Sequence, residues 1–270
     1  MALVKTDWLE KNIKNIKIID CSWHMPQTKR NGFEEYKENH IPNAIFFDLD
    51  KHSKIDTNLP HMLTDIKSWE EIMNNMGIAN NDTIVVYDNS DVISSCRCWY
   101  NLIYFGHNPN LVHVLDGGFK KWKKEKKVTN NLKVIPKVSK YSCKENKDLV
   151  KNKLQINENI IKKEFIVVDA RSRERFEGKV SEPRKGLRSG SIKNSFCLPY
   201  SELINEDRTF ISKDEILKKF KSLKFDLDEN IVFSCGSGIT ASVLALAYSL
   251  INDKYHPTIY DGSWAEYGMI

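Results

Sequence analysis

Short runs of apolar, often β-branched residues alternate with helix-length stretches along this chain of 270 residues. Short β-branched runs in alternation with helices are typical of a parallel sheet that helices cover on both faces. The pattern therefore predicts the α/β class. The clearest expected strands lie within Ile16–Asp20, Thr83–Asp88, Val112–Leu115, Phe165–Asp169, Asn230–Cys235 and Thr258–Tyr260.

The same order of signals occurs twice, with a period of about 150 residues that is far longer than a solenoid repeat. Each half closes on a strand with a similar ending, Val112–Gly118 in the first and Thr258–Trp264 in the second. This duplication predicts two tandem domains, each with a parallel sheet flanked by helices. We expect domains at residues 1–130 and 153–270, joined by a polar, Lys/Asn-rich linker at 131–152.

Composition is that of a globular protein, with 41% hydrophobic and 10% aromatic residues. No basic stretch leads into a long apolar run near the N-terminus, and no apolar segment approaches the roughly 20 residues that cross a bilayer. Six cysteines scattered over so long a chain indicate reduced thiols. We therefore expect a soluble, cytoplasmic protein with no membrane partner.

The net charge of +5 is modest and spread along the chain. Nucleic-acid binding needs basic residues gathered on one face with aromatic or motif support, and no such grouping is visible. The sequence therefore predicts no nucleic-acid partner.

The most informative segment is a Gly-rich loop, Ser234–Ala241, between an apolar strand and an apolar helix. Ligands bind at the carboxyl ends of strands in an open parallel sheet. Glycines let successive N–H groups point inward and cradle an anion at a helix N-terminus. A cysteine at the lip of such a cradle has its thiolate form stabilised, so Cys235 is the candidate nucleophile. The alternative is a buried structural cysteine beside a tight turn.

The loop Cys235–Thr240, read Cys-Gly-Ser-Gly-Ile-Thr, resembles the active-site loop of the 3-mercaptopyruvate sulfurtransferases in the rhodanese-like superfamily. The likeness covers nearly the whole chain. Its further segments are His40–Pro42, Leu59–Leu63, Glu182–Gly186 and Tyr260–Trp264. The resemblance implies tandem rhodanese-like domains in which only the second keeps the cysteine. The matching loop of the first half, Asp88–Asp91, indeed has no thiol.

The residues of the loop distinguish three kinds of enzyme that bind an anionic substrate beside a cysteine. A cysteine phosphatase needs an arginine shortly after its cysteine, and the position six residues on is Ala241. Thiosulfate-preferring rhodaneses resemble one another in carrying basic side chains in this loop. The loop here has Gly236, Ser237 and Gly238 without a charge, which fits a mercapto-acid whose carboxylate is bound elsewhere. The resemblance implies loop contacts to substrate from Gly236, Gly238, Ile239 and Thr240.

An arginine-rich stretch supplies candidates for that carboxylate, because a guanidinium matches a carboxylate with two parallel hydrogen bonds. By similarity to the family, Arg175 and Arg184 are the substrate-binding pair. Alternatively these arginines form surface ion pairs with nearby glutamates, the interpretation that we favour for Arg171, Arg173 and Arg188.

The resemblance also implies a hydrogen-bonded set beside the cysteine, formed by Asp50, His61 and Ser237. Ser237 would relay a proton, with His61 tuned by Asp50. The alternative for His61 is a structural histidine between the domains.

Together these features predict an enzyme that moves sulfur from 3-mercaptopyruvate to thioredoxin, a small thiol or cyanide through a Cys235 persulfide, with release of pyruvate. Such ping-pong covalent catalysis requires no metal or organic cofactor. Two alternatives stay open: a thiosulfate sulfurtransferase, and a non-catalytic rhodanese-type binding module.

Overall fold

The computed structural model describes residues 2–270, which divide into two compact units. The first unit contains the chain up to Ile55, Leu63–Asn146 and Asn205–Phe210. The second contains Asp56–Met62, Lys147–Ile204 and Ile211–Ile270. Two short segments, residues 56–62 and 205–210, thus belong to a different unit from their neighbours in sequence.

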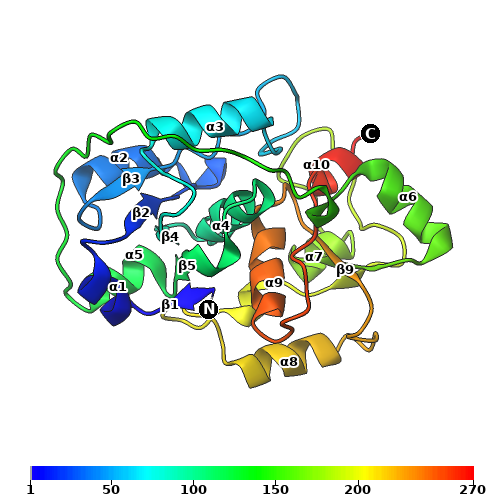
Figure 1. Cartoon of the computed structure of the whole chain (residues 1–270). Coiled ribbons are helices and arrows are strands. Elements are labelled where there is room, and N and C mark those ends of the chain that lie inside the picture. The colour runs from blue at the N-terminus through cyan, green and yellow to red at the C-terminus, as the bar shows by residue number, and fades with distance from the viewer. Residues whose placement is uncertain (1) are drawn as a thin grey trace. The chain divides into compact units, whose positions relative to one another are not determined.

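The first unit is built on a five-stranded parallel sheet with the order β1-β5-β4-β2-β3 (Figure 1). Its strands are β1 (Leu3–Val4), β2 (Lys17–Asp20), β3 (Ala44–Phe46), β4 (Ile84–Tyr87) and β5 (Val112–Leu115). Its helices are α1 (Thr6–Asn12), α2 (Gly32–Glu38), α3 (Ile66–Asn75), α4 (Ser95–Tyr104) and α5 (Gly118–Lys124), with 3-10 turns η1 (Pro26–Thr28) and η2 (Pro109–Leu111).

The core of the first unit forms where the two central strands are buried on both faces. Every residue of β4 is buried, as expected for a parallel strand covered on both sides. Trp69 of α3 stacks on Phe105 at 4.6 Å between ring centroids and packs edge-on against Phe47 at 5.8 Å. These aromatic contacts attach α3 to the unit.

The second unit repeats this topology, with the order β6-β10-β9-β7-β8 (Figure 1). Its strands are β6 (Val150–Lys151), β7 (Ile166–Asp169), β8 (Phe196–Cys197), β9 (Ile231–Ser234) and β10 (Ile259–Tyr260). Its helices are α6 (Lys153–Lys162), α7 (Arg173–Phe176), α8 (Lys213–Lys221), α9 (Ile239–Ser249) and α10 (Ser263–Tyr267), with 3-10 turns η3 (Lys147–Leu149) and η4 (Tyr200–Leu203).

Local sequence signals explain where the solvent-facing helices of the second unit begin. Asn152 before α6 and Ser212 before α8 both form capping boxes, in which the cap side chain accepts an N–H three residues on. α9 differs, because its residues are apolar on every side and it is buried along nearly its whole length. An aromatic cluster of Phe220, Phe233 and Tyr248 packs α8 and α9 onto β9.

The predicted α/β class with two parallel sheets is confirmed. The sequence pattern missed the two-residue edge strands β1 and β6, which are too short to show a period. β6 lies at the end of the segment expected as a linker, where it pairs with β10. The boundaries at 131–152 stay a prediction. Among residues 2–270, no helix is long and apolar enough to cross a membrane.

Candidate active site

The loop that follows β9 turns sharply from strand to helix at the carboxyl edge of the second sheet. β9 ends at Ser234 and α9 begins at Ile239. Gly238, the residue before the helix, has φ of 81°, in the left-handed region that favours glycine. Cys235 is 2% exposed, so its side chain is enclosed by the loop and its surroundings.

The beginning of α10 fixes the orientation of the loop's peptide groups. The N–H groups of Trp264 and Ala265 donate to the carbonyls of Cys235 and Gly236, both at 2.9 Å. The Cys235 N–H donates to Ser263 Oγ at 3.2 Å, and Ser263 Oγ donates to Tyr260 O at 2.9 Å. These three bonds attach the first two residues of the loop to α10.

The next amides of the loop form the anion cradle. Within residues 2–270, the backbone N–H groups of residues 236–240 have no hydrogen-bond partner. Unpaired, converging N–H groups at the start of a helix favour negative charge. This geometry suits the anionic sulfur that was predicted at Cys235, and it includes the four backbone positions, Gly236, Gly238, Ile239 and Thr240, expected to contact substrate.

Arg175 and Arg184 both reach the cysteine loop. A Cβ atom built on Gly236 would lie 3.4 Å from Arg175 Nη2 and 3.6 Å from Arg184 Nη1. The glycine at this position therefore leaves room for two guanidinium groups beside the loop. Arg184 Nη2 also donates to Ser237 Oγ at 3.3 Å.

Arg175 is held by a buried carboxylate. Its Nη2 and Nε donate to the two oxygens of Glu182 at 2.6 and 3.2 Å, and the Glu182 side chain is 1% exposed. Among the described residues, Arg175 Nη1 donates no hydrogen bond. The arginine is thus oriented by Glu182 and keeps one nitrogen for another acceptor.

Arg171 also donates to the Glu182 carboxylate that holds Arg175. It donates to Glu182 at 2.8 Å and to Asp169 at 2.7 Å, and its guanidinium lies 4.3 Å from the centroid of Trp264. A structural role for Arg171 was the favoured interpretation, but a surface ion pair was wrong, since Arg171 is 2% exposed. Arg173 pairs with Glu202 at an exposed position.

His61 belongs to the second unit, although its place in the sequence is within the first half. Its Nδ1 lies 2.9 Å from Ser237 Oγ, and its side chain is buried. Ser237 therefore contacts both His61 and Arg184. Because Ser237 Oγ accepts a hydrogen bond from Arg184, its own hydroxyl hydrogen can be donated to His61 Nδ1.

Asp50 is placed in the first unit. Both of its carboxylate oxygens accept from Trp23 Nε1, at 3.0 and 3.1 Å. The contact that sequence resemblance implied between Asp50 and His61 stays a prediction.

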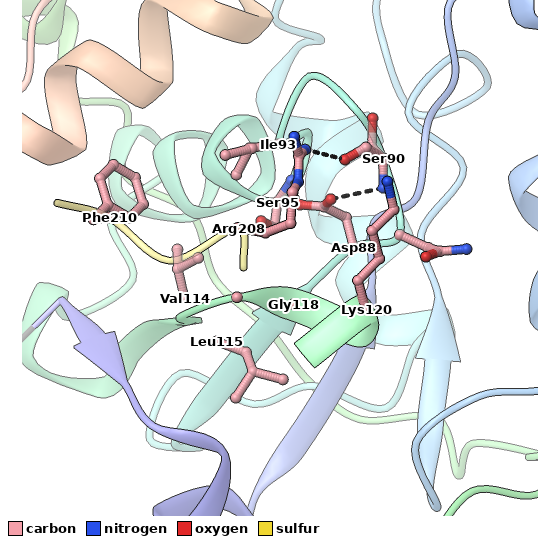
Figure 2. Close-up of a pocket in the computed structure, with 12 residues that line it drawn as sticks. Asp88, Ser90, Ile93, Ser95, Val114, Leu115, Gly118, Lys120, Arg208 and Phe210 are labelled. Atoms are coloured by element: carbon pink, nitrogen blue, oxygen red, sulfur yellow. Dashed lines mark hydrogen bonds between the residues drawn. The ribbon is translucent and has the colours of Figure 1, made fainter. Parts of the chain in front are cut away.

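The matching loop of the first unit is filled by its own side chain (Figure 2). Asp88 stands where Cys235 does, because the Phe119 N–H donates to Asp88 O at 2.9 Å, as Trp264 does to Cys235 O. The Asp88 carboxylate accepts the N–H groups of Ser90 and Ser95 at 2.8 and 2.9 Å. Burial raises the pKa of Asp88.

This first loop has no room for a substrate. The cavity that Figure 2 shows has a volume of about 10 Å³, which is space for a single water. Arg208 closes it by donating to Ser90 O at 2.6 Å, and Lys120 pairs with Asp91 at 2.7 Å. The amides that could cradle an anion here are already occupied by a carboxylate.

A cysteine beside unpaired loop amides, on a duplicated α/β scaffold, is typical of a class of enzymes that form covalent intermediates on cysteine. The profile of the rhodanese-like domain matches residues 5–125 and 152–269. The chain therefore belongs to the rhodanese-like family, and the resemblance inferred from the sequence is confirmed.

Full-length relatives agree with this assignment. Thiosulfate/3-mercaptopyruvate sulfurtransferase 2 of Arabidopsis thaliana is 37% identical over 98% of this chain and 83% of its own. Thiosulfate sulfurtransferase of Rattus norvegicus is 35% identical over 98% of this chain and 91% of its own. SseA of Escherichia coli, described as a 3-mercaptopyruvate sulfotransferase, has a TM-score of 0.88 at 31% identity, over 97% and 98% of the two chains. The expectation of a sulfurtransferase is confirmed.

Sequence reasoning missed the support that α10 gives to the cysteine loop. The ending Asp261–Trp264 was recognised as a sign of duplication and of family resemblance, without a role in the loop. Its Ser263 has φ of 48°, in the left-handed region, and this strained position aims Oγ at the Cys235 N–H. All six cysteines are free thiols, and residues 2–270 contain no cluster of three or more His, Cys, Asp or Glu that could hold a metal.

Replacing Ser263 by alanine should disturb the loop, because the buried Cys235 N–H then loses its acceptor. An unsatisfied buried donor costs about 1–3 kcal/mol. We expect Ser263→Ala to lower the free energy of unfolding by about that amount and to slow alkylation of Cys235, as measured by denaturant titration and iodoacetamide kinetics. Ser249→Ala, which removes only the 2.7 Å bond to Leu246 O, is the control. Equal behaviour of the two variants would show that Ser263 does not position the loop.

Proposed function

We propose that this chain transfers sulfur from 3-mercaptopyruvate to a thiol acceptor through a persulfide on Cys235. The observation that carries the proposal is the set of unpaired amides at residues 236–240 behind a thiol that two arginines approach. Both donors named for the relatives present a sulfur and an anionic group, so donor preference depends on the side chains of the loop. Residues 235–240 carry no charged side chain, which favours the mercapto-acid.

The substrate carboxylate binds at the two arginines in this proposal. Arg184 is half-buried and lies beside Gly236, and Arg175 Nη1 has no protein acceptor within the described residues. Glu182 accepts hydrogen bonds from Arg171 and Arg175 and so holds Arg175 beside the loop. A carboxylate held there places the substrate's sulfur toward the cysteine loop.

In the first half-reaction, the Cys235 thiolate attacks the sulfur of the substrate. A sulfur–sulfur bond forms and the carbon–sulfur bond breaks, with its electron pair leaving on carbon as the enolate of pyruvate. A proton delivered to that carbon gives pyruvate. The loop amides stabilise the negative charge that remains on the outer sulfur of the persulfide.

Ser237 is the group we assign to proton transfer. Its Oγ lies 2.9 Å from His61 Nδ1, so the hydroxyl can exchange a proton with the imidazole while it contacts substrate. Arg184 donates to the same oxygen, which favours its deprotonated form. We further propose that Asp50 tunes His61, as in the family that the sequence resembles.

In the second half-reaction, an acceptor thiolate attacks the outer sulfur and restores the Cys235 thiolate. Thioredoxin or a small thiol fits this step, because each supplies a nucleophilic sulfur, and cyanide serves in an assay. The cycle is redox-balanced with sulfur and protons alone, so it needs no metal or organic cofactor. The reduced state of its thiols agrees with the proposed cytoplasmic location.

Cys235→Ser is the direct test of the covalent step. We expect incubation of the wild-type chain with 3-mercaptopyruvate to add one sulfur atom to Cys235, detected by intact mass and peptide mapping, and pyruvate release to stop in the variant. Cys197→Ser is the control, since Cys197 is a second buried thiol on β8 of the same unit. Normal pyruvate release by Cys235→Ser, or no added sulfur in the wild type, contradicts the mechanism. The latter result would favour the non-catalytic binding module.

Arg184→Ala should impair use of the substrate by removing a charge-assisted contact to its carboxylate. Such a contact contributes about 1.5–3 kcal/mol, so we expect kcat/KM for 3-mercaptopyruvate to fall about 10- to 150-fold, mainly through KM. Arg173→Ala is the matched control, because Arg173 forms an exposed ion pair with Glu202. If both variants retain wild-type kcat/KM, Arg184 does not bind the substrate.

The second candidate is a thiosulfate sulfurtransferase, since relatives with that name are equally similar to this chain. Comparison of kcat/KM for 3-mercaptopyruvate and thiosulfate under the same conditions separates the two. The uncharged loop predicts a preference for 3-mercaptopyruvate of at least about tenfold, the ratio that one ionic contact to a dianion provides. A reversed preference would assign the thiosulfate activity.

A further inference from the structure

A second cavity of the first unit lies at the carboxyl edge of its sheet, between β2 and the Asp88 loop. Its volume is about 290 Å³, at the lower limit of small-molecule pockets. Three carboxylates and two aromatic rings dominate its wall. The lining residues are Asp20, Ser22, Glu35, Tyr36, Glu38, Asn39, Asn89, Phe119 and Lys123.

The duplicated fold shows what the corresponding space holds in the second unit. Asp20 is paired with Tyr87 across the sheet, as Asp169 is with Ser234. The Ser22 N–H donates to Asp20 Oδ1 at 2.9 Å, and the Arg171 N–H donates to Asp169 Oδ1 at the same distance. Ser22 therefore stands at the position of Arg171.

Two more walls of the cavity correspond in the same way. Phe119 corresponds to Trp264, because their N–H groups donate equivalent hydrogen bonds to the first carbonyl of each loop, Asp88 O and Cys235 O. Asn39 precedes the buried Ile41 by two residues, as Gly190 precedes the buried Ile192.

In the second unit a guanidinium occupies this place. Arg171 donates to the Asp169 carboxylate and to Gly190 O, at 2.7 and 2.8 Å, and lies 4.3 Å from the Trp264 centroid. Its side chain is 1% exposed. In the first unit Ser22 is shorter than Arg171 and does not fill this place. The corresponding residues, Asp20, Asn39 and Phe119, therefore surround an open space.

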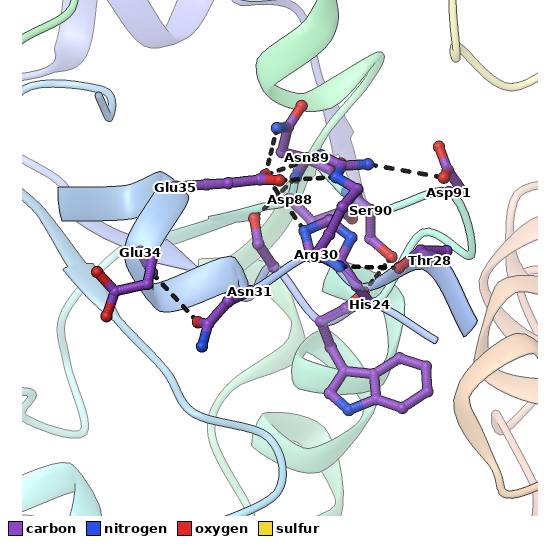
Figure 3. Close-up of polar contacts among 12 residues, drawn as sticks. His24, Thr28, Arg30, Asn31, Glu34, Glu35, Asp88, Asn89, Ser90 and Asp91 are labelled. Carbon is purple, nitrogen blue, oxygen red and sulfur yellow. Dashed lines mark hydrogen bonds and ion pairs between the residues drawn. The ribbon is translucent and has the colours of Figure 1, made fainter. Parts of the chain in front are cut away.

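The carboxylate at the bottom of this space lies in a buried site. Asp20 is 2% exposed, and burial raises its pKa to about 6. Glu35 is already occupied, because it binds Arg30, His24 and Asn89 at 2.6 to 3.2 Å (Figure 3). Glu38 stands at the exposed rim without a hydrogen bond or ion pair to any described residue.

The rim already places one cation beside an aromatic wall. Lys123 Nζ lies 4.9 Å from the centroid of Phe119, and this lysine is otherwise exposed. The buried ring of Phe119 thus has a cation beside it, as the buried ring of Trp264 has in the second unit.

We propose that the cavity of the first unit binds the guanidinium group of a small alkylguanidinium compound, with Asp20 pairing with it and Phe119 stacking on it. The ligand takes the place that the Arg171 side chain fills in the second unit. A planar guanidinium suits a carboxylate and an aromatic face better than an ammonium does. The site is separate from Cys235 and does not depend on the sulfur chemistry.

The test is a titration of the full, isotope-labelled chain with methylguanidinium chloride, followed by NMR at constant ionic strength. We expect saturable shifts of the amides of Ser22, Asn39 and Phe119. Asp20→Asn, whose oxygen can still accept the Ser22 N–H, should weaken binding at least about tenfold, because the ion pair is lost. Ser22→Arg should abolish it, because the new side chain fills the space as Arg171 does.

Asn110→Arg is the matched control, since it adds an arginine at an exposed position of the same unit and should bind like the wild type. Circular dichroism and melting curves verify that each variant is folded. If Ser22→Arg does not fold, the binding measured for Asp20→Asn tests the proposal. The proposal is overturned if the wild type shows no saturable shift, if folded Asp20→Asn or folded Ser22→Arg binds as tightly as the wild type, or if methylammonium binds as tightly as methylguanidinium.

Discussion

The structure depends most on the way α10 captures the carbonyls of the cysteine loop. Two N–H groups of α10 bind Cys235 O and Gly236 O, and Ser263 takes the Cys235 N–H. Once these groups are paired, the following amides have no partner within the described residues and favour negative charge near them. A thiolate, a persulfide or an enolate is stabilised by such preorganised donors without any rearrangement at the moment of reaction. The chemistry proposed for Cys235 is therefore a consequence of backbone pairing.

The two units show how one scaffold can be open in one copy and closed in the other. In both, the central strand is followed by a loop whose first carbonyl accepts an N–H from a later helix, α5 in the first unit and α10 in the second. In the first unit the Asp88 carboxylate accepts the loop's own amides, so the cradle is saturated from within. In the second unit Cys235 has no oxygen to offer, and the amides of residues 236–240 have no partner among the described residues. The first loop is also longer, with seven residues between β4 and α4 against four between β9 and α9.

A second contrast, with the roles of the units reversed, lies at the ends of β2 and β7. There the second unit is closed and the first is open. Arg171 fills its place with a guanidinium that neutralises Asp169 and Glu182, and this orients Arg175 toward the cysteine loop. A buried carboxylate with such partners is well accommodated, whereas one without them is costly. Ser22 supplies no charge to Asp20, and a cavity remains there. In each unit, therefore, a side chain fills one of two places: Asp88 fills the loop in the first unit, and Arg171 fills the space beside Asp169 in the second.

The sequence by itself determined the α/β class, the duplication and the loop around Cys235, because short apolar runs, spaced glycines and the absence of a thiol at Asp88 are local signals. It also selected Arg175 and Arg184, through resemblance. The resemblance grouped His61 with Ser237, but only the tertiary structure decided that His61 joins the second unit and that Ser263 supports the loop. These contacts join residues far apart in the chain. No local periodicity encodes them, since they arise only when the sheet and its helices are packed.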